Sequence, residues 1–222
     1  MPPSPGGTLR LKSFSGRVTI TPTDKDEATI DAVRRADRDW LDRYKLEIYS
    51  EGSSTVVVKE NQRDSGSWFS WSRRNRIVET DFDIKVPRKT DLNIQVFSAA
   101  VNVTGIEGSH RVHTFSSRVR LDDVSGSLKG HSFSGGWDIH EKSWAENQSI
   151  DVDTFSGSVE LHVPENARGR VTFSSFSGRL NSELPLTLNK GGRRSLDGEL
   201  GGSRTGGSLR FHTFSGSVRI NR

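Results

Sequence analysis

A short motif, repeated seven times, constrains the fold of this 222-residue chain more than any other feature. The motif is a phenylalanine followed by serine and then by a small residue, as in Phe155-Ser156-Gly157. From Phe97 to Phe176 the copies recur every 18 to 22 residues, a period typical of solenoids, whose repeats pack only on their neighbours. The copies begin at Phe14, Phe97, Phe115, Phe133, Phe155, Phe176 and Phe214.

Hydrophobic alternation around the motif predicts two strands per repeat. With each phenylalanine as position 0, positions 4 and 6 are mostly apolar, as in Val159 and Leu161. A second apolar pair stands five and three residues before it, as in Ile150 and Val152. Apolar residues at every second position indicate a strand with one buried face. We therefore expect an all-β fold, a single-chain β-solenoid with about 18–22 residues per turn. The pattern does not show the handedness of the coil; the usual form is a right-handed parallel β-helix.

The phenylalanine itself is expected to fill the interior where one strand turns into the next, with the small residue at position 2 leaving room for stacked rings. On this interpretation Phe155→Ala costs about 3–5 kcal/mol as a core truncation, whereas Ser156→Ala changes stability little. The 38 residues between Phe176 and Phe214 predict a degenerate copy between them, at Leu196-Asp197-Gly198-Glu199-Leu200.

Residues 1–222 are treated as one domain, in which residues 77–222 form regular turns and residues 1–76 form an irregular N-terminal third. Residues 9–20 match the repeat, and residues 78–86 match it with valine in the phenylalanine place. The remaining N-terminal expectations are a second strand from Ala28 to Val33, a helix from Ala36 to Lys45, a hairpin of Leu46 to Tyr49 with Thr55 to Val58, and a long loop from Asn61 to Arg76.

Composition excludes several functional classes. There is no cysteine, which removes thiol catalysis, disulfides and cysteine metal sites. Thirty-two basic residues stand against 28 acidic ones and are spread along the chain, so nucleic acid is not an expected partner. No apolar run approaches the roughly 18 residues of a membrane helix. Residues 1–7 lack the basic start and apolar stretch of a signal peptide, and we expect a leader or anchor to have been removed.

The Phe-Ser-Gly repeats and the valine–proline corners, as in Asp83-Ile84-Lys85-Val86-Pro87, resemble the bacterial putative-adhesin family of β-strand-repeat proteins. The resemblance covers nearly the whole chain, from Gly7 to Ile220. It implies a right-handed β-solenoid that is secreted or displayed on the cell envelope behind a signal or membrane segment. It brings no agreed catalytic residues and no cofactor.

Position 7 carries the candidate metal ligands. It reads Asp122, His140, His162 and Glu183 on four turns, and neighbouring imidazoles and carboxylates can bind a divalent metal. The alternative is a solvated column at a corner of the coil.

Two acidic residues at position 5 raise a catalytic alternative. Asp138 and Glu160 stand on adjacent turns, and paired carboxylates cleave sugar bonds in glycosidases. The catalytic signal is weak, because acidic residues are common at outward strand positions. A further column, two residues before the phenylalanine, holds His113, His131 and His212 with Asp153 and Ser174, and we expect it to be inert.

The loop of residues 68–76 supplies the candidate surface-binding residues, Trp68, Phe69, Trp71, Arg73, Arg74 and Arg76. Aromatic rings beside guanidinium groups can stack on sugars or bases, or insert at an anionic membrane surface. The alternative is that the loop packs its own aromatics against the coil, with Trp40 and Tyr44 as partners.

These features favour a non-catalytic scaffold of the cell envelope or the secreted fraction, which presents an extended surface to a protein, glycan or envelope component. No cofactor is expected. A β-helix enzyme acting on polysaccharide is the second hypothesis, and a structural or sensing element of envelope stress is the third.

Overall fold

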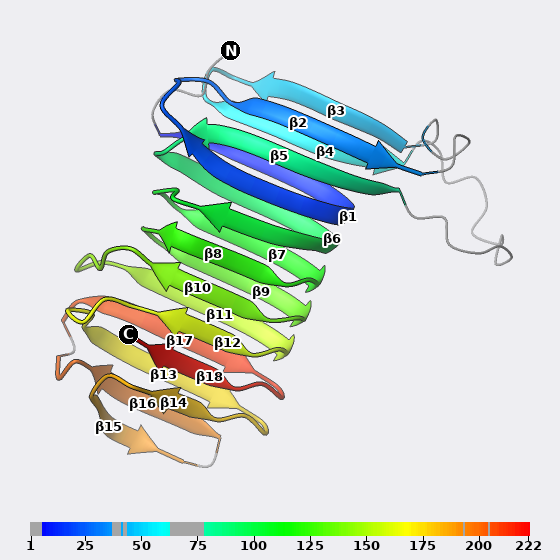
Figure 1. Ribbon diagram of the computed structural model, residues 1–222. Helices are drawn as coiled ribbons and strands as arrows, with labels where there is room; N and C mark the ends of the chain where they lie inside the picture. The colour runs from blue at the N-terminus through cyan, green and yellow to red at the C-terminus, as the bar shows by residue number, and fades with distance from the viewer. Residues whose placement is uncertain (1–5, 37–40, 42–43, 63–77, 193, 204) are drawn as a thin grey trace, which may run out of the picture.

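The computed structural model describes residues 6–36, 41, 44–62, 78–192, 194–203 and 205–222. All secondary-structure elements in these ranges are strands, which are hydrogen-bonded into one 18-stranded sheet. Figure 1 shows the strands stacked as the rungs of a coil, with β1 to β5 at one end and β15 and β16 at the other. The expectation of an all-β fold is confirmed.

Each turn of the coil consists of a strand before the phenylalanine and a strand after it. We call the sheet of preceding strands the leading sheet and the sheet of following strands the trailing sheet. β1 (Gly7–Thr23) and β6 (Thr90–Thr104) run through both sheets. The other leading strands are β7 (His110–Ser116), β9 (Leu128–Ser134), β11 (Ser149–Ser156), β13 (Gly169–Ser175) and β17 (Gly207–Thr213), and the other trailing strands are β8 (Val119–Val124), β10 (Trp137–Glu141), β12 (Val159–His162), β14 (Leu180–Ser182) and β18 (Val218–Asn221).

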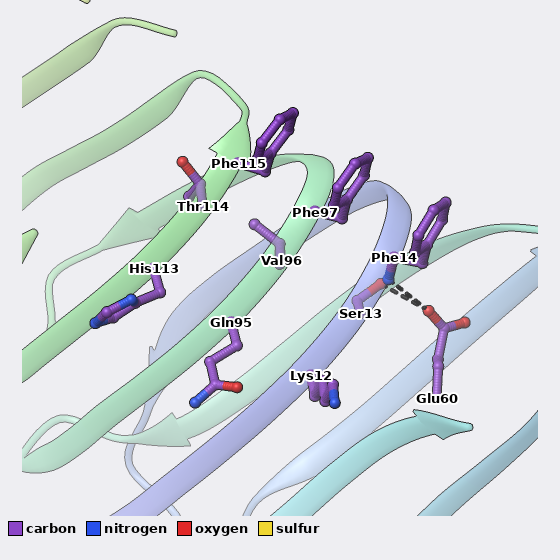
Figure 2. A pocket seen from close by; sticks show the side chains of 10 residues that line it. All are labelled: Lys12, Ser13, Phe14, Glu60, Gln95, Val96, Phe97, His113, Thr114 and Phe115. Carbon is purple, nitrogen blue, oxygen red and sulfur yellow. Dashed lines mark hydrogen bonds between the residues drawn. The ribbon is translucent and has the colours of Figure 1, made fainter. Parts of the chain in front are cut away.

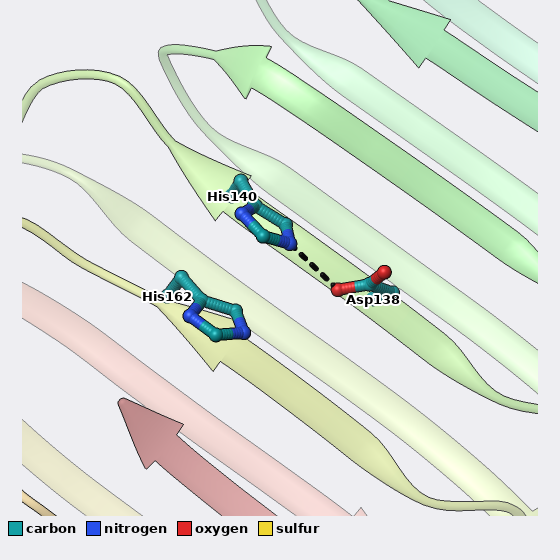
Figure 3. A group of neighbouring side chains, drawn as sticks. All are labelled: Asp138, His140 and His162. Atoms are coloured by element: carbon teal, nitrogen blue, oxygen red, sulfur yellow. Dashed lines mark hydrogen bonds and ion pairs between the residues drawn. The ribbon is translucent and has the colours of Figure 1, made fainter. Parts of the chain in front are cut away.

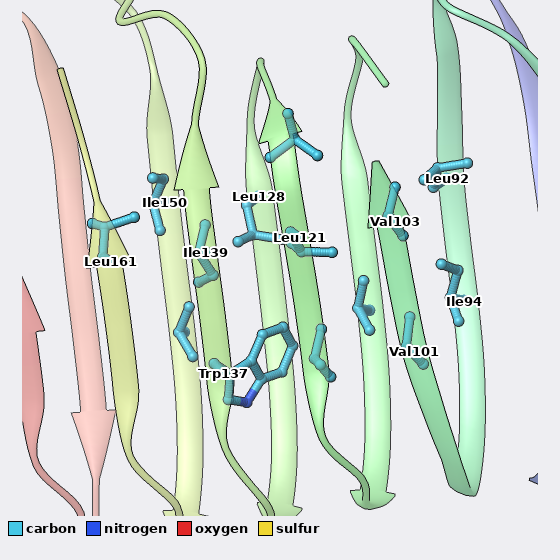
Figure 4. Close-up of a cluster of buried hydrophobic side chains, with 14 of the residues drawn as sticks. Leu92, Ile94, Val101, Val103, Leu121, Leu128, Trp137, Ile139, Ile150 and Leu161 are labelled. Atoms are coloured by element: carbon cyan, nitrogen blue, oxygen red, sulfur yellow. The ribbon is translucent and has the colours of Figure 1, made fainter. Parts of the chain in front are cut away.

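Equivalent residues of successive turns are paired in parallel register, as the repeat predicts. On the trailing sheet the position-4 residues pair in the series Val101, Val119, Trp137, Val159 and Val218. Their side chains are at most 2% exposed. Together with the inward residues of the leading sheet they form one continuous buried cluster along the coil (Figure 4).

The order of the turns in space differs from their order in the sequence. The last turn, β17 and β18, lies between the turn of β11 and β12 and the turn of β13 and β14 (Figure 1). Residues Leu196 to Leu200 are therefore not a degenerate coil turn. They belong to β16 (Ser195–Leu200), which pairs antiparallel with β13 and with β15 (Leu186–Gly191) and covers the end of the leading sheet.

Antiparallel strands also cover the other end of the coil. β4 (Thr55–Gln62) pairs in parallel with the leading half of β1, and β5 (Glu79–Pro87) pairs with its trailing half. β3 (Tyr44–Glu51) lies antiparallel to β4, and β2 (Thr29–Arg35) lies antiparallel to β5. Both ends of the parallel coil are thus bounded by antiparallel strands.

The N-terminal predictions have mixed outcomes. The hairpin is confirmed as β3 and β4, and the match of residues 78–86 is confirmed because Ile84 pairs with Ile20. The stretch from Ala28 to Val33 is a strand, but it runs antiparallel to β5 and is not the second strand of a turn. Of the expected helix, Tyr44 and Lys45 instead begin β3, and most of the remainder lies outside the described residues. The single-domain assignment stays a prediction.

The seven phenylalanines lie on the outside of the coil, and the prediction that they fill its interior is wrong. Their exposed fractions are 42–53%. Each phenylalanine continues the leading strand. In that strand the inward side chains are those at positions −5, −3 and −1, and Thr154 is an example at position −1. Position 0 therefore points outward, since side chains alternate along a strand. The change of parity occurs directly after the phenylalanine, because positions 0 and 1 are both exposed in turns such as that of Phe155 and Ser156.

The small residue at position 2 makes room for the backbone of the next turn and not for rings. A Cβ atom on Gly157 would lie 2.0 Å from the carbonyl oxygen of Gly135, and one on Gly135 would lie 1.8 Å from that of Ser117. Gly135 also has a φ of +113°, which L side chains rarely adopt. Close approach of stacked backbones explains the glycines of the motif.

Candidate functional site

The most extended surface feature is the phenylalanine ladder, the continuous stack of all seven motif phenylalanines. Neighbouring rings are nearly parallel, with interplanar angles of 2–4°. Because the faces are stacked on one another, the ladder presents ring edges to solvent. In spatial order the ring centroids are 4.9, 4.7, 5.0, 5.0, 4.8 and 4.9 Å apart along Phe14, Phe97, Phe115, Phe133, Phe155, Phe214 and Phe176.

A charged side chain lies at each end of the ladder. Near Phe14, the Glu60 carboxylate accepts hydrogen bonds from the Ser13 hydroxyl at 2.8 Å and from the Phe14 backbone N–H at 3.0 Å, and also from the hydroxyl of Thr80. At the other end the Arg194 guanidinium lies over the ring of Phe176, 4.4 Å from its centroid. Both contacts help to hold the terminal rings in place.

A groove runs beside the ladder at its Phe14 end. It has a volume of about 490 Å³. Figure 2 shows Phe14, Phe97 and Phe115 along one side and a polar row along the other, with Glu60 at the end. The polar row consists of Lys12, Gln95 and His113, which occupy position −2 on successive turns.

Cationic side chains flank the ladder on both sheets. On the leading sheet, Arg111, Lys129 and Arg210 are exposed at position −4 and make no ion pair within the described ranges. Asp151 lies between Lys129 and Arg210 in the same column. On the trailing sheet, position 3 is arginine on three turns, at Arg17, Arg118 and Arg179. The ladder therefore lies between two rows in which cations predominate.

The position −2 column continues past the groove as a row of exposed imidazoles and one carboxylate. Its order in space is His113, His131, Asp153, His212 and Ser174, because the last turn of the sequence is inserted between two earlier turns. The ring of His131 is 3.7 Å from Asp153, and Ser174 is 2.7 Å from His212. Partial burial lowers the pKa of His113, and the neighbouring His131, Arg111 and Lys129 lower it further.

The position-7 column brings together three of its four predicted members. His140 and His162 are paired in register, and their rings stack 4.1 Å apart. The Asp122 carboxylate is 3.9 Å from Nδ1 of His140. Glu183 is not the neighbour of His162, because β18 intervenes and places Asn221 between the two turns. That part of the predicted column is wrong.

The predicted carboxylate pair at position 5 is in register but is bound by arginines. Asp138 pairs with Glu160 across β10 and β12. Arg120 lies 3.5 Å from Asp138, and Arg219 lies 3.2 Å from Glu160. Along this column the two carboxylates therefore lie side by side, with one arginine on either side of the pair. Asp138 and Glu160 line a groove of about 480 Å³ with Arg118 and Arg120.

A protein-family profile described as Toastrack DUF4097 matches residues 81–221, which is more than half of the chain. The chain belongs to the Toastrack DUF4097 family. The resemblance to a putative-adhesin family is thereby confirmed. No curated protein matches the chain.

Two solved structures are similar to this family member at low sequence identity. One is a putative cell adhesion protein from Clostridium sporogenes, with 10% identity, a TM-score of 0.48, and coverage of 99% of this chain and 93% of the other. The second is a putative adhesin from Bacteroides fragilis, with 11% identity, a TM-score of 0.42, and coverage of 97% and 94%.

Among the residues that the structure describes, two titratable side chains are buried inside this Toastrack coil. Glu141 is 7% exposed, and burial raises its pKa to about 8, against the opposing hydrogen bond from Gln148. His110 is 2% exposed, and burial lowers its pKa. The nearby carbonyl groups of Ile106 and Ser125 oppose this lowering of the pKa, but neither ring nitrogen has an acceptor at good hydrogen-bond geometry. Both groups are buried in their neutral forms near pH 7.

The candidate surface-binding residues from Trp68 to Arg76 lie outside the described residues, so that hypothesis stays a prediction. The described part of the chain contains no helix that is long and apolar enough to cross a bilayer. Sequence reasoning missed the phenylalanine ladder as a surface. The signal was present in the seven positions themselves, since an outward residue that is apolar in every repeat is unusual on a solvated sheet.

Proposed function

We propose that this Toastrack protein is a non-catalytic binding scaffold of the cell envelope or the secreted fraction, built as the right-handed β-solenoid expected from the sequence. The observation that carries the proposal is the phenylalanine ladder with its cationic flanks. Solenoids offer long rigid surfaces, and this one has a single continuous feature along roughly 29 Å of its length.

The ladder and its flanks favour an anionic ligand. The edge of an aromatic ring carries partial positive charge, and edges are what the stacked rings expose. Lys12, Arg111, Lys129 and Arg210 on the leading side and Arg118 on the trailing side add full positive charges within a few strand spacings. A straight, narrow, periodic feature matches a linear polymer better than a flat bilayer. The ligand class is a linear envelope polysaccharide that carries carboxylate or phosphate groups.

The proposal assigns no reaction to the position-5 carboxylates. Asp138 and Glu160 each have an arginine partner, whereas a glycosidase needs one protonated and one ionised carboxyl group that face the sugar bond. The carboxyl group with a raised pKa, Glu141, does not line the groove that holds Asp138 and Glu160. These observations support a binding role.

Affinity electrophoresis in gels that contain polygalacturonate, with dextran as the neutral comparison, tests the proposal. We expect the acidic polymer to retard the wild-type protein and dextran to leave its mobility unchanged. The double variant Arg111→Gln/Lys129→Gln should lose most of the retardation. The matched control Lys85→Gln/Lys89→Gln, which removes two exposed charges on and just after β5, should keep it.

Two results would contradict the proposal. Binding to phosphatidylglycerol vesicles without binding to the acidic polymer would point to a membrane surface as the partner. Size-exclusion chromatography would show whether the polygalacturonate chains become shorter during incubation. Shorter chains would show that the protein is an enzyme.

A further inference from the structure

Three potential metal ligands converge on the trailing sheet, away from the phenylalanine ladder. Asp138 and His140 lie on the same outward face of β10, two residues apart, and His162 is the in-register partner of His140 on β12. One ligand atom from each of the three lies within 4.8 Å of the others. Figure 3 shows the two rings side by side, with Asp138 next to them.

The contacts around the two rings favour ligation through Nε2. Nε2 of His140 is 2.8 Å from Oδ1 of Asp138. On the opposite side of this ring, Nδ1 is 3.9 Å from the Asp122 carboxylate. Nδ1 of His162 is 3.4 Å from the backbone carbonyl oxygen of Arg222. Without an ion, Nε2 of His140 donates its proton to Asp138, because the Asp122 carboxylate is beyond hydrogen-bond distance of Nδ1. An ion between Nε2 and Oδ1 of Asp138 replaces that proton, and acceptors beside Nδ1 then orient the rings, as they do for other metal-binding histidines.

From this geometry we propose that Asp138, His140 and His162 bind Zn²⁺ or a similar divalent transition-metal ion, with water in the remaining positions. Two imidazoles and one carboxylate suit such ions. The rings are stacked at an interplanar angle of 14°, so binding requires rotation about side-chain torsions but no change in the backbone. The three side chains are half-buried, which leaves an open path for the ion and its waters.

Two neighbouring groups weaken the site. Arg120 lies 3.5 Å from Oδ2 of Asp138, and its charge repels a cation bound at Oδ1. The amide nitrogen of Asn221 is 3.5 Å from Nε2 of His162, and this long contact is given up when the ion binds. Arg120 therefore lowers the affinity of the site for a cation, and removal of its charge tests whether the ion contacts Asp138.

Titration calorimetry with ZnCl₂ on the untagged, EDTA-treated full chain at pH 7.5 tests the proposal. We expect one ion per chain, with at least tenfold weaker binding in His140→Gln and His162→Gln. Arg120→Gln should bind several-fold more tightly than wild type. His131→Gln is the matched control, since His131 is also an outward imidazole beside a carboxylate, 3.7 Å from Asp153, and its binding should equal that of wild type.

Equal binding in wild type and in the double variant His140→Gln/His162→Gln would overturn the proposal. So would an Arg120→Gln variant that binds no more tightly than wild type, because the ion would then not contact Asp138. The visible absorption of bound Co²⁺ gives a second measurement, and circular dichroism of each variant confirms that the coil is intact. Loss of the Co²⁺ absorption bands is expected in the two histidine variants only. The site lies on the trailing sheet, so the outcome is independent of polymer binding at the ladder.

Discussion

The ring of Phe155 stacks on the ring of Phe214 at 4.8 Å and 3°, although β12 to β17 separate the two residues along the chain. On its other face Phe155 stacks on Phe133 at 5.0 Å. The ladder thus crosses, without a gap, the point where the last turn enters the coil. A side chain that is 46% exposed contributes through these two ring contacts more than through burial.

Phe155→Ala should therefore cost about 1–3 kcal/mol, from two aromatic contacts worth roughly 0.5–1.5 kcal/mol each. This loss is smaller than the roughly 3–5 kcal/mol expected for truncation of a phenylalanine in the core. Phe211→Ala is the matched comparison, because Phe211 is 1% exposed and its loss should cost about 3–5 kcal/mol. Urea unfolding of both variants measures the difference. Equal losses would mean that the ladder is as important to stability as the core.

Gly157→Ala tests the close approach of the turns. The new Cβ would lie 2.0 Å from the carbonyl oxygen of Gly135, a backbone atom that cannot move without its strand. We expect a loss of about 1–3 kcal/mol from this overpacking. Gly136→Ala is the control, since its Cβ would meet nothing nearer than 3.8 Å and should change stability by less than about 0.5 kcal/mol. Thermal unfolding of the two variants distinguishes backbone contact from a general intolerance of alanine.

The parallel register could be predicted because each inward position repeats the same residue type. Val159 and Val218 both stand at position 4, and they pair with each other in the coil. The same regularity hides the order of the turns, because Val218 fits equally well beside any other position-4 residue. The place of β17 between β11 and β13, and of β18 between β12 and β14, therefore depends on interactions that the pattern does not encode. The prediction that Glu183 neighbours His162 is wrong for this reason.

The orientation of the phenylalanines was predictable in principle but depends on which strand sets the parity. Counting back from Val159 and Gly157 puts Phe155 inside, whereas counting forward from Ile150 and Val152 puts it outside. The structure follows the leading strand, since β11 extends to Ser156.

The metal candidate was predicted in part. Asp138 was assigned to another column, although residues two apart on a strand share a face with each other.

The buried imidazole of His110 makes stability depend on pH. Its pKa is lowered by burial from the ordinary value of 6.5, so the unfolded chain binds the proton more tightly. This contribution to stability is complete above pH 6.5 and is lost as the pH falls through the folded-state pKa. The equivalent residues of the adjacent turns, Leu92 and Leu128, show that the position accepts leucine.

His110→Leu should accordingly stabilise the protein, and by more at pH 5 than at pH 8. At pH 8 the gain is about 1–3 kcal/mol, from the removal of a buried polar ring without hydrogen-bond partners. Chemical unfolding at the two pH values measures both quantities. A gain that is the same at pH 5 and pH 8 would show that His110 does not titrate on unfolding.

The buried carboxyl group of Glu141 acts in the opposite direction. Burial raises its pKa from 4.5 in the ordinary case to about 8, so the folded protein holds the proton more tightly than the unfolded chain. Its contribution to stability is present in full below pH 4.5 and is lost as the pH rises towards 8. Glu141→Gln keeps a neutral side chain of the same shape, which can still accept the hydrogen bond from Gln148. The difference in unfolding free energy between the variant and wild type should therefore be small at pH 5 and grow in favour of the variant up to about pH 8. A difference that is constant across this range would mean that the carboxyl group ionises as readily in the coil as in the unfolded chain.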